Sequence, residues 1–248
     1  MTAALTARPL APLPEVRPGD DLAALVRAAN DDAPFAPGDV LVVSHKVVSK
    51  AEGALIDLRA VTPSPRAVAL AAELEKEPAL VEVILGQTAE IVRARRGVLI
   101  CRTVHGFVCA NAGVDRSNVA EGWCVTLPAD ADASARALRA ALPGRPAVVI
   151  ADSFGRAWRQ GQAEVAIGCA GLETLDDQRG GTDRHGRELR ATVIATADHV
   201  AGAADLVRGK TSGQPAVVVG GLGARVTAED GPGAAVLRRA AEQDLFGA

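Results

Sequence analysis

Three short segments of the sequence combine carboxylates, hydroxyls and basic groups in patterns that suit chemistry on a charged ligand. The first is Ser44-His45-Lys46-Val47-Val48-Ser49-Lys50, which follows an apolar run. The chain has 27 basic residues, and only four of them are lysines, so two lysines within this segment are a marked concentration. Ammonium groups and neighbouring hydroxyls suit the phosphates of a nucleotide. The alternative is a set of solvated charges at the end of a strand.

The second segment, residues 106–119, is rich in small residues and then presents oxygen-bearing side chains. Its glycines allow the backbone to approach a ligand closely, and Asp115, Ser117 and Asn118 follow at short spacing. Mg²⁺ and Mn²⁺ favour a carboxylate combined with phosphate oxygens and water. The same residues also favour an Asx-rich turn, because Asp and Asn bond their own backbone.

The third segment places Asp152 and Ser153 directly after the apolar run 147–150. We expect Asp152 at the carboxyl end of a strand, where ligands commonly bind in sheets with helical crossovers. Asp152 and Ser153 offer adjacent oxygen ligands, and Arg156 and Arg159 could hold a phosphate or a carboxylate. The alternative is that Asp152 is the N-cap of a helix and the arginines are ordinary surface residues.

Two glycine-containing patterns suggest familiar nucleotide sites but lack the required spacing. Gly209-Lys210-Thr211 resembles the end of a phosphate-binding P-loop, yet Ala204 stands where that motif needs a glycine. A helix is predicted before this loop and a strand after it, which is the reverse of the P-loop order. The glycines at 220–223 lack the GxGxxG spacing of a Rossmann fold. Any nucleotide site must therefore be of another kind.

The elements that must position these segments form a mixed order of helices and strands. Apolar periodicity and capping residues predict helices over 20–30, 63–76, 129–142, 197–208 and 230–245. Apolar runs predict strands at 40–43, 90–92, 98–101, 147–150 and 216–219, with the second and third forming a hairpin. This order favours an α+β fold over a doubly wound sheet. No linker divides residues 1–248, so one functional domain is expected.

The composition is that of a globular protein without a general affinity for nucleic acids. The chain has 248 residues, of which 48% are hydrophobic and 23% charged, so it can bury a sizeable core and is not disordered as a whole. A net charge of −3 argues against general nucleic-acid binding. Aromatic residues make up 2% and tyrosine is absent, which argues against base-stacking surfaces.

The four cysteines are predicted to be buried thiols rather than metal ligands. Cys101, His105, Cys109 and Cys124 could suggest zinc, but Cys101 and Cys124 lie in apolar, strand-like runs and no CxxC pair occurs. Cys169 is the fourth cysteine of the chain. The N-terminal residues show no secretory signal, and no apolar stretch has the length of a membrane span. We therefore expect a cytoplasmic protein with reduced thiols.

Taken together, these segments resemble the coenzyme F420-0:L-glutamate ligase family, also called F420 gamma-glutamyl ligase. The matching segments cover most of the chain: 13–16, 19–22, 38–53, 106–119, 127–134, 152–171, 183–192 and 205–222. The resemblance is to the form without the C-terminal nitroreductase-like domain that some relatives carry. It implies two unequal α+β subdomains with mixed sheets and an intertwined homodimer. The apolar segment 163–172, which lacks an obvious partner within one subunit, also favours a dimer.

The resemblance implies a ligase in F420 biosynthesis. Members of the family use GTP and Mg²⁺ or Mn²⁺, with K⁺ as a further candidate, to join L-glutamate to the lactyl carboxylate of F420-0. Further glutamates are added through γ-linkages, and an acyl phosphate is the expected intermediate. The partners implied are these small molecules and a second copy of the chain, with no nucleic acid and no membrane. The alternatives are a ligase for another phosphorylated carboxylic acid, or a non-catalytic nucleotide-binding partner of the pathway.

The resemblance also assigns roles to individual residues. Asp115 and Asp152 match ligands of one metal, Ser153 matches a ligand of a second metal, and Lys50 joins the two aspartates as a catalytic residue. Many relatives carry an acidic residue in the loop 209–215, where this chain has Lys210-Thr211, so ligation of the second metal departs from the family pattern. We expect Lys50 to contact GTP phosphate and Lys210 to face solvent. The positions that match GTP contacts are Leu13, Pro14, Glu15, Val16, Ser44, His45, Lys50, Asn118, Gly209, Lys210 and Thr211.

Overall fold

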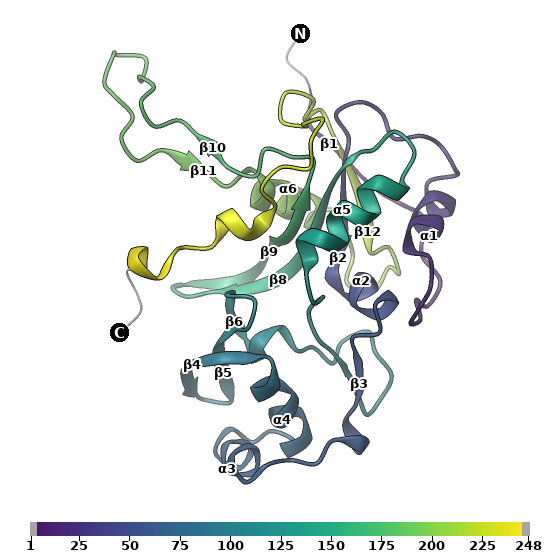
Figure 1. Cartoon of the computed structure of the whole chain (residues 1–248), viewed down its shortest axis with the longest axis vertical. Helices are drawn as coiled ribbons and strands as arrows, with labels where there is room; N and C mark the ends of the chain where they lie inside the picture. The colour runs from purple at the N-terminus through teal and green to yellow at the C-terminus, as the bar shows by residue number, and fades with distance from the viewer. Residues whose placement is uncertain (1–3, 245–248) are drawn as a thin grey trace.

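A five-stranded mixed sheet lies at the centre of the computed structural model, which describes residues 4–244 (Figure 1). β2 and β8 run parallel to each other, whereas all other neighbours within this sheet are antiparallel. The mixed sheet and the helices around it confirm the predicted α+β class. In spatial order the strands are β1 (Thr6–Pro9), β12 (Ala216–Gly220), β2 (Val40–Ser44), β8 (Ala147–Arg156) and β9 (Arg159–Ala170).

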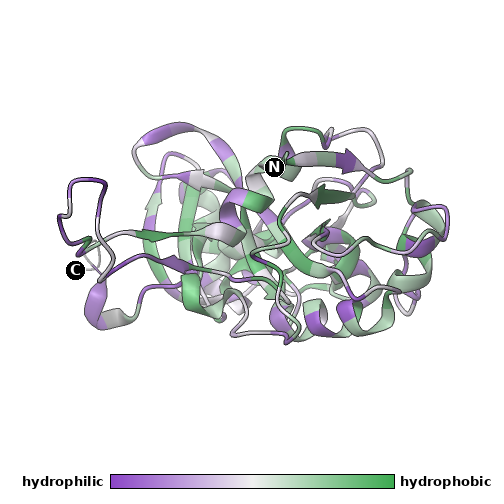
Figure 2. Cartoon of the chain, turned by 90° about the horizontal axis from the view of Figure 1, so that it is seen from above, coloured by the Kyte–Doolittle hydropathy of each residue, from purple (hydrophilic) through white to green (hydrophobic). Residues whose placement is uncertain are grey.

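Helices cover both faces of this sheet, which explains why its central strands are continuous apolar runs. Leu41 and Val43 of β2 belong to one cluster, together with α1 (Leu22–Ala29) and α5 (Ala131–Ala141). The alternate residues of β2 belong to a second cluster with α6 (Thr196–Asp205). Figure 2 shows the interior strands largely in hydrophobic colours. Among the helices of residues 4–244, none is long and apolar enough to cross a bilayer.

A second group of elements, drawn below the sheet in Figure 1, packs around a hydrophobic cluster of its own. Leu74, Ile84, Leu99 and Cys101 are central to that cluster. Its helices are α3 (Pro65–Leu74) and α4 (Pro78–Gly86), and its three-stranded antiparallel sheet is β4 (Thr88–Arg95), β5 (Val98–Thr103) and β6 (Val108–Ala110). β3 (Leu55–Asp57) pairs with β7 (Trp123–Val125), and the hairpin β10 (Asp176–Asp177) and β11 (Val193–Ile194) extends outward from the rest of the molecule (Figure 1).

Most of the predicted elements are present, but the predicted C-terminal helix 230–245 is wrong. Its described part contains two short 3₁₀ helices, Ala234–Leu237 and Ala241–Gln243, and Leu245 lies outside the described residues. Gly233 has a φ of 79°, a left-handed conformation that interrupts a helix. The Asp132 carboxylate then accepts hydrogen bonds from the Ala234 and Ala235 amides, which ties this segment to α5. The helices α2 (His45–Ala51) and α4 and the strands β1, β3, β6, β7, β9, β10 and β11 were not predicted.

The apolar segment 163–172 finds its partners within its own chain. It forms much of β9, which pairs with β8 along its length. Ile167 belongs to the cluster with α1 and α5, while Ala166 and Cys169 belong to the cluster with α6. This segment therefore gives no argument for a dimer, and the homodimer stays a prediction from the family resemblance.

The four cysteines are buried free thiols, as the sequence predicted. Burial raises the pKa of the Cys109 thiol to about 12 and those of Cys124 and Cys169 to about 11. At neutral pH these groups stay protonated, and a protonated thiol is a poor nucleophile and a poor metal ligand.

The packing of β9 against α5 leaves no room for a side chain at Gly168. A Cβ atom there would lie 2.3 Å from the backbone oxygen of Ala131. We expect Gly168→Ala to lower the free energy of unfolding by about 1–3 kcal/mol, the usual cost of overpacking. Urea unfolding measures the change.

The matched control for this substitution is Gly202→Ala, which also adds one methyl group. Gly202 lies inside α6, and a Cβ there would meet no atom within 4 Å. Because alanine favours a helix over glycine, this variant should gain about 0.5–1 kcal/mol. Equal effects of the two substitutions would contradict the packing described here.

Candidate active site

The parallel pairing of β2 with β8 brings two of the candidate segments together. Ser44, the last residue of β2, lies in register with Ala151 of β8. His45 begins α2 directly after β2, and Asp152 follows Ala151. The His45 side chain is 1% exposed, and its Nε2 atom is 3.2 Å from Oδ1 of Asp152. Its other ring nitrogen lies 3.4 Å from the Ser49 hydroxyl, so the imidazole is held from both sides.

The lysine-rich segment is the helix α2, and the alternative of solvated strand-end charges is wrong. Lys46 and Lys50 lie four residues apart and therefore project from the same side of the helix. The Lys46 ammonium is 2.9 Å from Oδ2 of Asp115. The Lys50 ammonium is 2.5 Å from Oε1 of Glu15, and the Lys50 side chain is only 6% exposed. Each lysine thus connects α2 to a different loop.

Asp115 combines the two arrangements that the sequence allowed. The Ser117 amide and hydroxyl both donate hydrogen bonds to its carboxylate, so the predicted Asx turn is present. The same carboxylate faces Lys46. Burial by itself would raise the pKa of Asp115, but the Ser117 amide and the Lys46 ammonium outweigh it and hold the pKa below its usual value. The carboxylate is therefore ionised at neutral pH.

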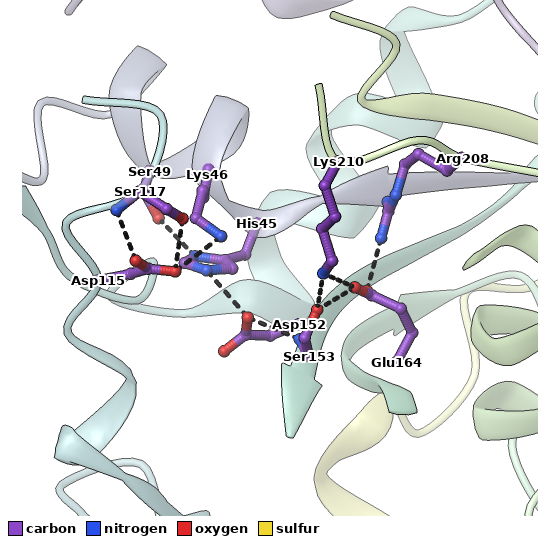
Figure 3. Close-up of polar contacts among 10 residues, drawn as sticks. All are labelled: His45, Lys46, Ser49, Asp115, Ser117, Asp152, Ser153, Glu164, Arg208 and Lys210. Atoms are coloured by element: carbon purple, nitrogen blue, oxygen red, sulfur yellow. Dashed lines mark hydrogen bonds and ion pairs between the residues drawn. The ribbon is translucent and has the colours of Figure 1, made fainter. Parts of the chain in front are cut away.

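Asp152 lies inside β8, which continues to Arg156. Two predictions are therefore wrong: Asp152 is neither at the end of a strand nor the N-cap of a helix. Burial would raise the pKa of Asp152, but His45, Lys46 and the Ser153 amide together lower it below its usual value. Lys46 contacts Asp115 directly and also lowers the pKa of Asp152, whose own contacts are His45 and the Ser153 amide (Figure 3). We call Asp115 and Asp152 the carboxylate pair.

A second cluster of charges begins at the residue after Asp152. Ser153 and Glu164 lie directly opposite each other on β8 and β9, so their side chains share one face of the sheet. The Ser153 hydroxyl donates a hydrogen bond of 2.5 Å to Oε1 of Glu164. Lys210 donates to the same hydroxyl at 2.5 Å, and Arg208 lies 2.7 Å from Oε2 of Glu164. We call these four residues the Ser153 cluster (Figure 3).

The arginine that faces this region is Arg208, and neither of the predicted arginines does so. Arg159 is exposed, and Arg156 donates to the backbone oxygens of Gln160 and Gly161 within the exposed β8–β9 turn. The sequence analysis missed Glu164 and Arg208 as site residues. Glu164 carried one detectable signal, because it is the single charged residue of the otherwise apolar segment 163–172.

Asp152, Lys46 and the Ser153 cluster border one cavity of about 540 Å³, a size typical of small-molecule sites. Three of the predicted residues are not in its wall: His45, which is buried, Asp115, which contacts the wall residue Lys46, and Thr211. Lys46, Glu164 and Arg208 line it in addition to the predicted set. The predicted residues in its wall are Leu13, Pro14, Glu15, Val16, Ser44, Lys50, Asn118, Asp152, Ser153, Gly209 and Lys210.

The donor sets of the two groups differ in their suitability for a divalent cation. The carboxylate pair offers two ionised carboxylates against one ammonium group, Lys46, so a hard cation can be accommodated there. The Ser153 cluster offers one carboxylate against two cationic side chains, so it does not fit a divalent cation. Within the part of the chain that the structure describes, no three His, Cys, Asp or Glu side chains are grouped to hold a metal on their own. A metal at the carboxylate pair would therefore need ligand oxygens or water as well.

The sequence of the chain matches a family model described as F420-0:Gamma-glutamyl ligase over residues 11–221. This chain belongs to that family. Its relatives include the coenzyme F420:L-glutamate ligase of Methanopyrus kandleri, which is 45% identical over 94% of this chain and 93% of the relative. The enzyme of the same name from Methanothermobacter thermautotrophicus is 42% identical over 94% of this chain and 95% of the relative. Every segment that builds the cavity lies within the family match.

Breaking the buried ion pair between Arg208 and Glu164 should destabilise the fold, because one charge would then stay buried alone. Their side chains are 8% and 3% exposed. We expect Arg208→Met to lower the free energy of unfolding by about 3 kcal/mol, because it leaves a buried carboxylate without its closest charged partner. Urea unfolding of the purified variant measures this loss.

The control for this prediction is the double variant Arg208→Met/Glu164→Leu. It removes the whole ion pair and should recover most of the lost stability, because an apolar replacement leaves no buried charge. A loss below about 1 kcal/mol in the single variant would be the behaviour of an exposed ion pair and would contradict the burial described here.

Proposed function

We propose that this protein is a GTP-dependent ligase that joins L-glutamate to the lactyl carboxylate of coenzyme F420-0 and then adds further γ-linked glutamates. The observation that carries the proposal is the cavity whose wall contains Asp152 and the lysines of α2, one of which, Lys46, contacts Asp115. Family membership and the names of the relatives support the choice of substrates. We further propose that the protein acts as a cytoplasmic homodimer.

The reaction must turn a carboxylate oxygen into a leaving group, because a carboxylate does not condense with an amine in water. In the proposed first step a carboxylate oxygen of F420-0 forms a bond to the γ-phosphorus of GTP, and the bond from that phosphorus to GDP breaks. In the second step the glutamate nitrogen bonds to the acyl carbon, inorganic phosphate leaves, and the nitrogen, an ammonium at the start, loses two of its three protons. Positioning and charge neutralisation supply most of the catalysis in phosphoryl transfer.

Each part of the cavity has a role in this proposal. The Lys50 ammonium, held by Glu15 at 2.5 Å, would bind nucleotide phosphate, and the loop 13–16 with Asn118 would bind the rest of the nucleotide. Asp115 and Asp152 would hold Mg²⁺ or Mn²⁺, and Lys46 would turn from Asp115 toward phosphate oxygens when the cation binds. A cation bound there would neutralise phosphate charge. His45 would keep Asp152 in place through its contact with the Asp152 carboxylate, since His45 is buried and outside the wall of the cavity.

The test is an incubation with GTP, MnCl₂, L-glutamate and F420-0, followed by detection of GDP and of a mass gain of one glutamyl unit. GDP release that requires a different phosphorylated acid would indicate another acceptor. Nucleotide binding without turnover of any acceptor would indicate a non-catalytic partner of the pathway. Either result would contradict the proposed function.

We expect Asp115→Asn and Asp152→Asn each to abolish glutamyl transfer at saturating Mn²⁺. Each substitution is nearly isosteric but removes one formal charge from the proposed cation site. Asp31→Asn is the matched control, because Asp31 is exposed, lies outside the cavity wall and has a left-handed backbone that asparagine tolerates. It should keep wild-type activity. Turnover by either site variant within a few-fold of wild type would show that these carboxylates do not hold the cation.

We expect Lys50→Met to lower GTP affinity or turnover by about 10- to 150-fold, the effect of losing a charge-assisted contact of about 1.5–3 kcal/mol. The fold should tolerate this change, because the partner carboxylate of Glu15 is 71% exposed and water can solvate it. Lys76→Met is the control, since Lys76 lies outside the cavity wall. The GTP concentration dependence of both variants measures the effect, and equal values would contradict the role of Lys50.

A further inference from the structure

Lys210 lies in the wall of the cavity and makes a specific contact there. The Lys210 side chain is 66% exposed, which agrees with the expectation that it faces solvent. Its ammonium nevertheless donates a hydrogen bond to the Ser153 hydroxyl at 2.5 Å. The same ammonium is 3.7 Å from Oε1 of Glu164. Figure 3 shows the Lys210 side chain descending from its loop onto Ser153.

The hydrogen bonds of Ser153 are arranged for a cation at that position. A hydroxyl has one proton and two lone pairs, and the Ser153 proton is directed to Glu164 at 2.5 Å. A lone pair of the same oxygen accepts from Lys210. The hydroxyl is thus oriented so that its acceptor side meets a positive charge, and that charge is the ammonium group.

The Ser153 cluster carries more positive charge than its one carboxylate can neutralise. Arg208 alone pairs with Glu164 at 2.7 Å in a buried contact. Lys210 adds a second positive charge beside a carboxylate that is already neutralised, so the surplus is available to an anion in the cavity. A divalent cation at Ser153 would lie next to two positive side chains. The carboxylate pair shows the opposite balance, with two carboxylates and the ammonium of Lys46.

We propose that the Lys210 ammonium takes the position of a second metal ion, so that each chain binds one divalent cation with its nucleotide and Lys210 itself contacts the phosphates. The inference rests on the proposed function, because it assumes a nucleoside triphosphate in the cavity. Lys210 supplies the positive charge beside Ser153, and the carboxylate pair holds the single metal ion. No P-loop geometry is required, since the ammonium acts as a point charge fixed through Ser153.

The test counts Mn²⁺ in the complex with a non-hydrolysable GTP analogue by electron paramagnetic resonance. Metal ions in two-metal sites lie about 3.5–4 Å apart, so two Mn²⁺ ions would give a spin-coupled spectrum, whereas one ion gives an isolated six-line spectrum. We expect one Mn²⁺ per wild-type chain and the isolated spectrum. Two ions per wild-type chain, or a coupled spectrum, would overturn the inference.

The decisive variant is Lys210→Glu, which exchanges the ammonium for a carboxylate beside Ser153 and Glu164. It should bind two Mn²⁺ ions per chain and give the coupled spectrum. Lys76→Glu makes the same change in net charge outside the cavity wall and should still bind one. A single Mn²⁺ ion in a folded Lys210→Glu variant would overturn the inference, because Lys210 would then not be what excludes the second ion.

A second variant keeps the inference testable if the charge reversal prevents folding. Lys210→Ala should bind the GTP analogue about tenfold more weakly, the effect of a lost charge-assisted contact partly screened by water. Propylammonium chloride should restore part of the affinity, and sodium chloride at equal ionic strength should not. Unchanged affinity in Lys210→Ala, or equal effects of the two salts, would overturn the inference.

These results separate the inference from the proposed function. One Mn²⁺ ion per chain without glutamyl transfer to F420-0 would contradict only the proposed reaction. Two Mn²⁺ ions per chain with normal glutamyl transfer would contradict only the role of Lys210. Failure of the wild-type protein to bind the GTP analogue would overturn both.

Discussion

The parallel pairing of β2 with β8 is the constraint on which the rest of the site depends. Because parallel strands end at the same edge of a sheet, the start of α2 and the residues after Ala151 must lie side by side. That register places His45 against Asp152 at 3.2 Å. α2 then directs Lys46 toward Asp115 and Lys50 toward Glu15, so two distant loops converge on one helix.

The second strand pairing, β8 with β9, extends the site in the other direction. Asp152 belongs to the carboxylate pair, and the next residue, Ser153, belongs to the cluster with Glu164 and Lys210. Two adjacent residues of β8 therefore belong to two groups of side chains, one with an excess of negative charge and one with an excess of positive charge. In the proposed function, one end of the cavity would meet a metal cation and the other an anion. A nucleotide with its metal ion has the same two requirements.

The site gathers buried charges, and the fold compensates for each of them. Desolvation opposes ionisation of both Asp115 and Asp152, but neighbouring cations and amide groups hold their pKa values below the usual range. Arg208 pairs directly with the buried Glu164 carboxylate at 2.7 Å. The apolar clusters on both faces of the sheet provide the rigid support that such a polar site needs, because these pairings stabilise only in correct geometry.

The sequence by itself determined the α+β class, the three polar segments and about half of the helices and strands, because apolar periodicity and residue chemistry are local properties. It also identified most of the cavity wall through the resemblance to a known family. The tertiary structure alone decided that Asp152 lies inside a long strand, that Arg208 and not Arg156 faces the cavity, and that Lys210 contacts Ser153. These facts follow from strand register and from loops that meet across the sheet. Contacts between residues far apart in the chain leave no periodic signal in the sequence, so only the folded arrangement defines them.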